Sequence, residues 1–390
     1  MAGAAHPLQS LRVLDLSRLL PGPFCTLILS ELGAEVVKVE DTAMGDYLRV
    51  FPPQREGQGG AFYALNRGKR SVAINLKRPE GRDLLLRLIP DFQVVVESFR
   101  PGVIERLGLG FETLRAANPE VVLCSITGYG QDGPLASRAG HDINYLALSG
   151  VLASGGAAQS APALPGVQIA DIAGGALWAA IRILAALHGG GGVHLDVSMT
   201  EGAMAFLLPW LGDMAFGGPP LRRGEATLNG GAACYGPYRT DDGRYLAVGA
   251  LEPKFFASMV RALGLDSDGA LNNPMASPEQ QEQQRQLLGR ALAEKSRDAW
   301  AEQLAAADAC VEPVLEMDEL AVHPLHRERG MFYTLDDPRR GPVTQLRLPG
   351  TTAPASTPAP LQGEHTDQVL AEAGVDHDEL AELRRTGVIR

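Results

Sequence analysis

Three titratable side chains stand where the sequence pattern predicts the start of a helix. His141 lies in residues 140–145 (Gly-His-Asp-Ile-Asn-Tyr), which open an apolar helical run, and Asp171 directly precedes another apolar helix. Glu252 follows a predicted strand and precedes Pro253. Imidazoles and carboxylates transfer protons, and backbone N–H groups at a helix start can stabilise a developing oxyanion. The pattern therefore suits general acid–base chemistry.

The same residues also have purely structural interpretations. Asp142 and Asp171 stand where an aspartate commonly caps a helix N-terminus, and His141 is then an ordinary polar neighbour. Glu252 has the position of a first-turn acid favoured by the helix dipole. The residue pattern alone leaves both interpretations open.

A glycine loop and a basic run are further candidates for ligand binding. Residues 128–133 (Gly-Tyr-Gly-Gln-Asp-Gly) match a dinucleotide fingerprint, but Pro134 and a polar loop replace the required helix, so a glycine loop is favoured over an NAD site. A basic run, continued by two arginines after the next strand, suits either a solvated face or a ligand with several phosphates. The residues concerned are Arg67, Lys69, Arg70, Lys77, Arg78, Arg100 and Arg106.

Short apolar runs alternate with amphipathic helical patterns over the first 130 residues. Helices are expected at 23–32 and 78–88, the first closed by Gly33. Strands are expected at 11–16, 35–40, 71–76, 94–97 and 121–125. This alternation predicts βαβ units and a mostly parallel sheet.

The middle of the chain has a different pattern. A long apolar helix is expected from Asp171 to about His188, and a strand and a second apolar helix within 193–214. Strands at 235–238 and 244–248 flank a turn at 240–243, and amphipathic helices follow to about Ala306. This favours a second, smaller α+β domain. Residues 349–360, rich in Pro, Ala and Thr, are expected to form an extended linker.

Composition excludes several classes of protein. The net charge of −11 disfavours binding to nucleic acid or an anionic membrane. The four scattered cysteines form no CxxC pair, so neither a zinc site nor a disulfide framework is expected. No apolar run approaches the length of a transmembrane helix, and no basic stretch followed by an apolar run opens the chain. We therefore expect a cytoplasmic protein without a metal.

Several segments together resemble the family III CoA-transferase and α-methylacyl-CoA racemase superfamily. They lie at 11–17 (LRVLDLS), 21–23 (PGP), 32–40 (LGAEVVKVE), 66–71 (NRGKRS), 100–103 (RPGV), 127–134 (TGYGQDGP) and 363–366 (GEHT). Residues 140–145 and 249–253 (GALEP) are similar to the racemase branch. In one departure, Asp41 stands where some racemases have an arginine that meets the nucleotide.

The resemblance implies an α/β fold with a large Rossmann-like domain, a smaller α+β domain and an interlocked homodimer. The large CoA-binding domain then comprises 1–195 and 335–390, the small domain 231–320, and the linkers 196–230 and 321–334. The active site would lie between the large domain of one subunit and the small domain of the other. Coenzyme A would be contacted by Ile74, Asn75, Leu76, Lys77, Ser98, Phe99, Arg100, Arg106, Gly140, Asp142, Ile143, Asn144 and Tyr145.

The resemblance also implies an activity. His141 and Asp171 would move the α-proton of a 2-methylacyl-CoA thioester through an enolate, with Glu252 holding His141. No cofactor is then needed, because coenzyme A is part of the substrate. The alternatives are a CoA-transferase in which Asp171 attacks the thioester, and a CoA-binding sensor without turnover.

Overall fold

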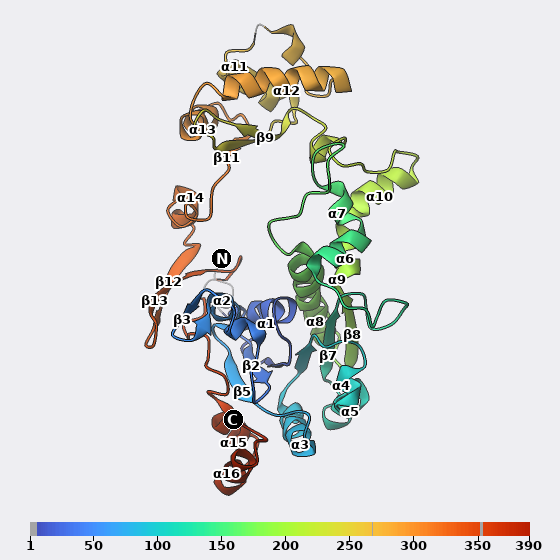
Figure 1. The fold of residues 1–390 in the computed structure, drawn as a ribbon, viewed down its shortest axis with the longest axis vertical. Helices are drawn as coiled ribbons and strands as arrows, with labels where there is room; N and C mark the ends of the chain where they lie inside the picture. Colours follow the sequence, from blue (N-terminus) through green and yellow to red (C-terminus); the bar gives the residue numbers. More distant parts are fainter. Residues whose placement is uncertain (1–5, 267, 352–353) are drawn as a thin grey trace. The chain divides into compact units, whose positions relative to one another are not determined.

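The computed structural model describes residues 6–266, 268–351 and 354–390. Contacts divide the chain into two compact units, and each is coloured along the sequence in Figure 1. The first unit comprises Met1–Ser149, Val167–Phe206 and Pro324–Arg390, and the second Gly150–Gly166 and Leu207–His323. Residues 150–166 thus group with the second unit, whereas the sequence-based division, which stays a prediction, gave them to the large domain.

A six-stranded parallel sheet in the order β5-β2-β1-β6-β7-β8 forms the centre of the first unit. The strands are β1 (Arg12–Asp15), β2 (Glu35–Glu40), β5 (Arg70–Ala73), β6 (Val94–Glu97), β7 (Val122–Thr127) and β8 (Val193–Ser198). Their valines and leucines, except Val193, are buried because helices cover both faces, which explains the nearly continuous apolar runs. The α/β fold class is confirmed.

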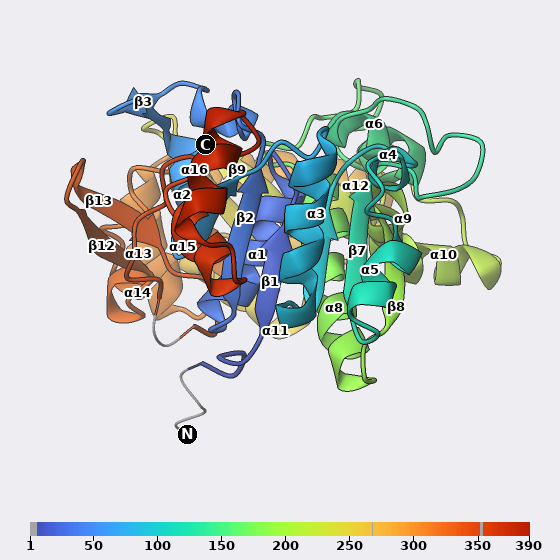
Figure 2. The ribbon, with the colours of Figure 1, turned by 90° about the horizontal axis from the view of Figure 1, so that it is seen from below.

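Helices lie on both sides of this sheet (Figure 2). On one side α3 (Pro79–Leu88), α5 (Phe111–Ala117), α15 (Thr366–Glu372) and α16 (His377–Arg385) enclose the largest hydrophobic core. On the other side α1 (Pro21–Glu31) and α8 (Trp178–His188) pack on the strands. Shorter elements of the first unit are η1 (Tyr47–Arg49), α2 (Gly60–Asn66), η2 (Ile89–Asp91), α4 (Val103–Arg106), α6 (Asp142–Ser149), η3 (Ala170–Leu177), α9 (Met199–Met204) and α14 (Pro324–Glu328).

Two antiparallel hairpins of the first unit were not predicted. They are β3 (Gln54–Arg55) with β4 (Gln58–Gly59), and β12 (Phe332–Asp337) with β13 (Gly341–Leu346). β12 begins inside the segment 321–334 that was predicted to be a linker. Beyond the second hairpin, the expected linker at 349–360 lies partly outside the described residues.

Most members of the basic run form ion pairs within the first unit and are not a solvated face, whereas the contact of Lys77 and Arg100 with a phosphorylated ligand stays a prediction. Arg67 and Lys69 are buried against Glu31 and Asp15, and the Lys69 Nζ–Asp15 Oδ2 distance is 3.1 Å. The remaining pairs are Arg70 with Glu35 and Glu372, and Arg78 with Glu80. Except for Glu80, these carboxylates come from other segments of the chain, so local charge patterning did not reveal them.

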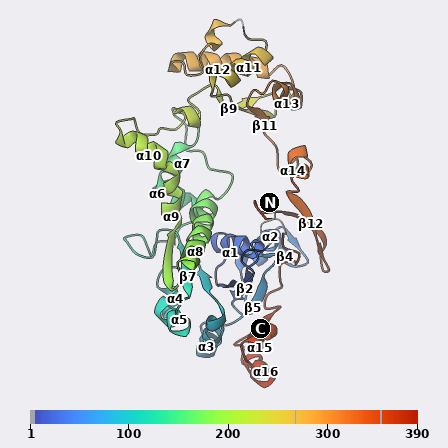
Figure 3. The same cartoon turned by 180° about the vertical axis from the view of Figure 1, so that it is seen from behind.

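The second unit contains an antiparallel sheet and amphipathic helices, as predicted, and its third strand was not predicted (Figure 3). Its sheet consists of β9 (Tyr235–Arg239), β10 (Tyr245–Gly249) and β11 (Val311–Pro313). The helices α11 (Pro253–Ala262), α12 (Pro278–Leu292) and α13 (Arg297–Ala306) bury their apolar faces in one core with this sheet. Shorter elements are α7 (Val151–Ser154), α10 (Leu208–Ala215), η5 (Thr227–Asn229) and η6 (Gly269–Leu271), and η4 (Ala205–Leu207) crosses the unit boundary.

One helical segment corrects an expectation from the sequence. Ala170–His188 is long and apolar enough, by length and composition alone, to cross a membrane. The sequence-based count missed it because Asp171 and Arg182 interrupt the apolar run, whereas its mean hydropathy tolerates both charges. One such helix is weak evidence for a membrane span, and here α8 packs on β7 and β8.

Candidate active site

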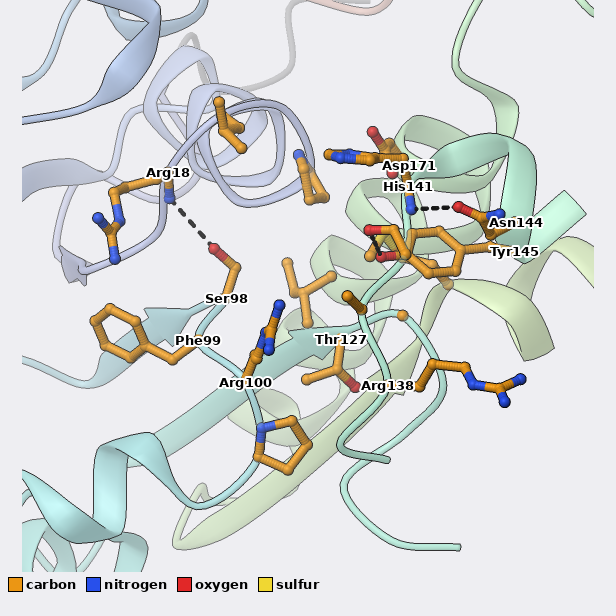
Figure 4. A pocket seen from close by; sticks show the side chains of 18 of the residues that line it. Arg18, Ser98, Phe99, Arg100, Thr127, Arg138, His141, Asn144, Tyr145 and Asp171 are labelled. Carbon is orange, nitrogen blue, oxygen red and sulfur yellow. Dashed lines mark hydrogen bonds between the residues drawn. The ribbon is translucent and has the colours of Figure 1, made fainter. Parts of the chain in front are cut away.

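A pocket of about 700 Å³ opens in the first unit at the C-terminal ends of β1, β6 and β7 (Figure 4). This is the end of a parallel sheet at which ligands gather, because the loops that leave the strands diverge there. The loops after these three strands, the segment around Gly140, η3 and α9 all contribute to its wall. Its polar lining residues are Arg18, Tyr47, Ser98, Arg100, Thr127, Arg138, His141, Asn144, Tyr145 and Asp171.

Arg18 stands on the loop after β1 and was not singled out in the sequence. Its guanidinium carbon lies 5.1 Å from the centre of the Tyr47 ring and 5.7 Å from that of Phe99. Its Nη1 donates to the Tyr47 hydroxyl at 3.1 Å, and its backbone N–H donates to Ser98 Oγ at 3.2 Å. Arg18 thus joins two walls of the pocket. The signal that was missed is an arginine in the loop that follows an apolar strand, where a ligand loop is expected.

Close packing of Tyr145 fixes the segment that carries His141. A Cβ atom on Gly128 would lie 2.3 Å from Tyr145 Cε1, and one on Gly140 2.6 Å from the same atom, so both positions require glycine. The Tyr145 hydroxyl donates to the Gly140 carbonyl at 2.5 Å, directly before His141. His141 in turn precedes α6, and its N–H donates to Asn144 Oδ1 at 3.0 Å. The backbone of His141 is therefore fixed at a helix N-terminus that lines the pocket, as expected from the sequence.

Asp171 lies on η3, a π-helical stretch that packs closely on α9. A Cβ atom on Gly202 would lie 1.9 Å from the Gly174 carbonyl oxygen, and one on Gly174 would lie 2.6 Å from the Met199 carbonyl oxygen. The two backbones can approach this closely only because both positions are glycine. Short π-helical stretches often occur at functional sites, and this one directs attention to Asp171.

Two corrections concern the start of this helix. Asp171 is not its N-cap, because η3 begins at Ala170 and Ile169 is the capping residue. The backbone N–H groups of Asp171 and Ile172 are also not free for an enolate. The first donates to Asp142 Oδ1 at 2.9 Å, and the second to the Gln168 carbonyl at 3.0 Å.

The surroundings of Asp171 shift its acidity towards neutral pH. Burial, and then the neighbouring Asp142 carboxylate, raise the pKa of Asp171 to about 7. Burial, and then the negative charge of Asp171, raise the pKa of Tyr145 to about 12. Asp171 can therefore be populated in both protonation states near neutral pH, which is the property of a general acid–base residue.

The residues predicted to contact coenzyme A fall into two groups. Ser98, Phe99, Arg100, Gly140, Asn144 and Tyr145 line the pocket together with His141 and Asp171. Ile74, Asn75, Leu76, Lys77, Arg106, Asp142 and Ile143 do not line it. Within the second group, Ile74 is buried in the large core and bridges to Ile389. Asp142 acts on the pocket indirectly, because its Oδ1 accepts from the Asp171 N–H. Asp41, which stands where some racemases have an arginine, instead accepts from the N–H of Met44 at 2.9 Å in the loop after β2.

Two other candidates lie outside this pocket. Glu252 belongs to the second unit, where it occupies the N-cap position of α11 without a side-chain capping hydrogen bond and is exposed. In the glycine loop at 128–133 only Gly128 lines the pocket, and no helix starts at Gly133. This supports the rejection of an NAD site. Within the described residues, no group of three or more His, Cys, Asp or Glu side chains is arranged to hold a metal ion.

Comparisons with known proteins agree with this architecture. Residues 8–366 match the family described as CoA-transferase family III. The chain is 38% identical to the Homo sapiens alpha-methylacyl-CoA racemase, with 98% of this chain and 97% of the relative covered. It is 31% identical to the Homo sapiens succinyl-CoA:glutarate CoA-transferase, with 98% and 90% covered. A crystal structure of a CAIB/BAIF family protein from Brucella suis superposes with a TM-score of 0.83 at 30% identity, covering 94% of this chain and 99% of that one. The chain belongs to CoA-transferase family III and is an enzyme.

Proposed function

We propose that this enzyme is a racemase of 2-methylacyl-CoA thioesters that inverts the carbon next to the thioester carbonyl. The observation that carries the proposal is the meeting of His141 and Asp171 in one pocket with the 98–100 loop. The racemase relatives at 38% identity over nearly the whole chain support it.

The chemistry requires two groups that exchange roles. A thioester delocalises the negative charge of its α-carbanion onto the carbonyl oxygen, so the α-proton is mildly acidic. One group removes this proton, and the other returns a proton on the opposite face. Asp171, with a pKa raised to about 7 by burial and by Asp142, can start in either form. His141 supplies the second group, and the reaction then runs in both directions without a further cofactor.

A CoA-transferase is the second candidate, and relatives at 31% identity favour it. In that mechanism the Asp171 carboxylate attacks the thioester carbonyl, expels the CoA thiolate and becomes a mixed anhydride. A transferase has no evident need for an imidazole beside this carboxylate. The pairing of His141 with Asp171 is thus the feature that favours the racemase.

A single substrate distinguishes these mechanisms. Incubation with a chiral 2-methylacyl-CoA in deuterated water is expected to give α-deuterium incorporation and loss of optical purity. Both should fall severely in His141→Ala. Hydroxylamine is expected to have no effect during turnover. In the contrary outcome, hydroxylamine inactivates the enzyme only when acyl-CoA is present and leaves its label on the Asp171 carboxyl. That result would overturn the racemase proposal and establish the transferase.

The proposal extends to assembly and location. Glu252 orients His141 across an interlocked homodimer, in which the partner's Glu252 completes each site, and the enzyme acts in the cytoplasm on lipid-derived acyl-CoA. Co-expression of His141→Ala with Glu252→Ala chains then gives heterodimers with one intact site, and partial activity is expected. A purified heterodimer without activity would contradict the shared site.

A further inference from the structure

Glu97 is a buried carboxylate that the proposed reaction does not use. It ends β6, its side chain is 1% exposed, and it does not line the pocket. Its Oε2 accepts from the backbone N–H of Phe99 at 2.6 Å. Phe99 is the middle residue of the 98–100 loop, and all three residues of this loop line the pocket. Glu97 therefore holds the 98–100 loop from outside the pocket.

Behind Glu97, a line of hydrogen bonds crosses two further strands. The strand register pairs Glu97 with Ser125 on β7, and the Ser125 hydroxyl is a hydrogen-bond partner of the Glu97 carboxylate. Ser125 Oγ also lies 2.9 Å from His194 Nε2 on β8. The His194 ring stacks on Phe111 of α5, with 5.9 Å between ring centres. Phe111 thereby restrains the imidazole at the end of the line.

The single hydroxyl proton of Ser125 couples the two ends of this line. When Glu97 is ionised, Ser125 donates to its carboxylate, and His194 must then donate its Nε2–H to Ser125. When Glu97 is protonated, it donates to Ser125, Ser125 donates to Nε2, and the proton of the neutral His194 ring sits on Nδ1. The protonation state of Glu97 and the tautomer of His194 are therefore linked.

The surrounding charges place this change near neutral pH. Burial first, and then the carboxylates of Glu105 on α4 and Asp196 on β8, raise the pKa of Glu97 to about 7, against hydrogen bonds from Ser125 and Phe99 that lower it. His194 itself also faces this line, and the fully buried Cys124 thiol, next to Ser125 on β7, interacts electrostatically with Glu97. Burial lowers the pKa of His194, against the carboxylates of Glu105 and Asp196 that raise it, and so favours the neutral ring.

We propose that Glu97 is a positioning residue for acyl-CoA binding, which holds the 98–100 loop through the Phe99 amide and is coupled through Ser125 to His194. This inference rests on the proposed function, since the ligand of the loop is taken to be acyl-CoA. The ionised carboxylate holds the amide more strongly than the neutral acid, because charge-assisted hydrogen bonds are roughly twice as strong. Acyl-CoA should therefore bind more tightly as the pH rises through the titration of Glu97.

Asp171→Asn is a suitable background for the test, because it removes both turnover and the titration of Asp171. In this background the dissociation constant of acyl-CoA, measured by calorimetry, is expected to fall about fivefold between pH 6 and pH 8. Addition of Glu97→Gln, which mimics the neutral acid, should abolish this pH dependence. The dissociation constant should then keep the larger value of pH 6 over the whole range. Addition of Glu120→Gln, an exposed carboxylate that lies outside the pocket and is not among the groups that shift Glu97, should retain the pH dependence.

A second measurement does not depend on the ligand. Nitrogen-15 spectra of the histidine side chains should show His194 as the Nε2–H tautomer at pH 8 and the Nδ1–H tautomer at pH 6. Glu97→Gln should keep it as Nδ1–H throughout. An unchanged pH dependence of binding in the Glu97→Gln chain, or an unchanged tautomer, would overturn the inference. Absence of acyl-CoA binding in the Asp171→Asn parent would instead count against the proposed function, and the tautomer would still test the coupling.

Discussion

One aspartate of the first unit is fully buried and another is partly buried at the pocket, and their pKa values move in opposite directions. Asp15 is fully buried in an ionic cluster formed by Asp15, Lys38, Asp46 and Lys69. Burial alone would raise its pKa, but Lys38 and Lys69, together with hydrogen bonds from Ser17 and Thr26, outweigh burial and hold the pKa well below the usual range. For Asp171 burial and Asp142 act together, and the pKa rises to about 7.

The difference shows that burial does not decide what a carboxylate does, whereas its charged neighbours do. A buried carboxylate between two ammonium groups is locked in one ionisation state, which suits structure. A buried carboxylate beside another carboxylate is kept near its titration point, which suits proton transfer. The ionic cluster also supports the pocket, because Asp46 Oδ1 accepts from the Leu19 N–H at 3.2 Å, and Leu19 lines the pocket.

The largest expected effect belongs to the chemistry at Asp171. Asp171→Asn keeps the shape of the side chain but cannot exchange a proton, so α-deuterium exchange should fall by roughly 10²–10⁴-fold. The circular dichroism spectrum and the thermal unfolding profile should still show a folded protein. Asp132→Asn, an exposed aspartate outside the pocket, is the matched control and should retain full exchange. Retention of exchange by Asp171→Asn would break the contrast with Asp15.

The corresponding change in the ionic cluster should act on the fold. Asp15→Asn leaves Lys38 and Lys69 buried with one carboxylate fewer, and uncompensated buried charge costs about 3–5 kcal/mol. Denaturant unfolding at pH 7 should show a loss of that order in the free energy of unfolding, and the loss should shrink in acid. Asp83→Asn, on the exposed surface of α3, is expected to change it by less than about 0.5 kcal/mol.

A smaller effect separates two arginines that the family resemblance treats alike. Arg100 lines the pocket, whereas Arg106 is exposed outside it. Arg100→Ala should raise the KM for acyl-CoA by roughly 10- to 100-fold, because a charge-assisted contact contributes about 1.5–3 kcal/mol. Arg106→Ala should change the KM by only a few-fold. Equal effects in steady-state assays at low salt would show that the coenzyme A site extends beyond this pocket.

The sequence predicted the sheet well because a parallel strand buried on both faces is a continuous apolar run, as at Val94–Glu97. It also located His141, since the helix after it has a clear start. It did not predict the partners of buried charges. Lys69 pairs with Asp15, 54 residues away along the chain, and nothing local distinguishes it from a surface lysine. The π-helical turn at Asp171 was missed for a similar reason, because Gly174 and Gly202 acquire their role only when η3 and α9 pack together.

The last prediction tests the comparison through stability rather than activity. The pKa of Asp171 in the folded enzyme is about 7, above the ordinary value of 3.8, so the folded state holds a proton that the unfolded state has lost between these values. Its contribution to stability is complete below about pH 4 and is lost as the pH rises through 7.

The amide introduced by Asp171→Asn has no such proton to lose, so this variant should unfold like the parent at pH 4 but be more stable at pH 8 by roughly 1–2 kcal/mol. Asp15→Asn should be less stable than the parent at pH 8, because the pKa of Asp15 is lowered on folding. The stabilisation by the ionised Asp15 is therefore present above its ordinary pKa. Thermal unfolding midpoints of both variants at pH 4 and pH 8 would measure this. The same sign for both at pH 8 would mean that their neighbours do not set the two carboxylates apart.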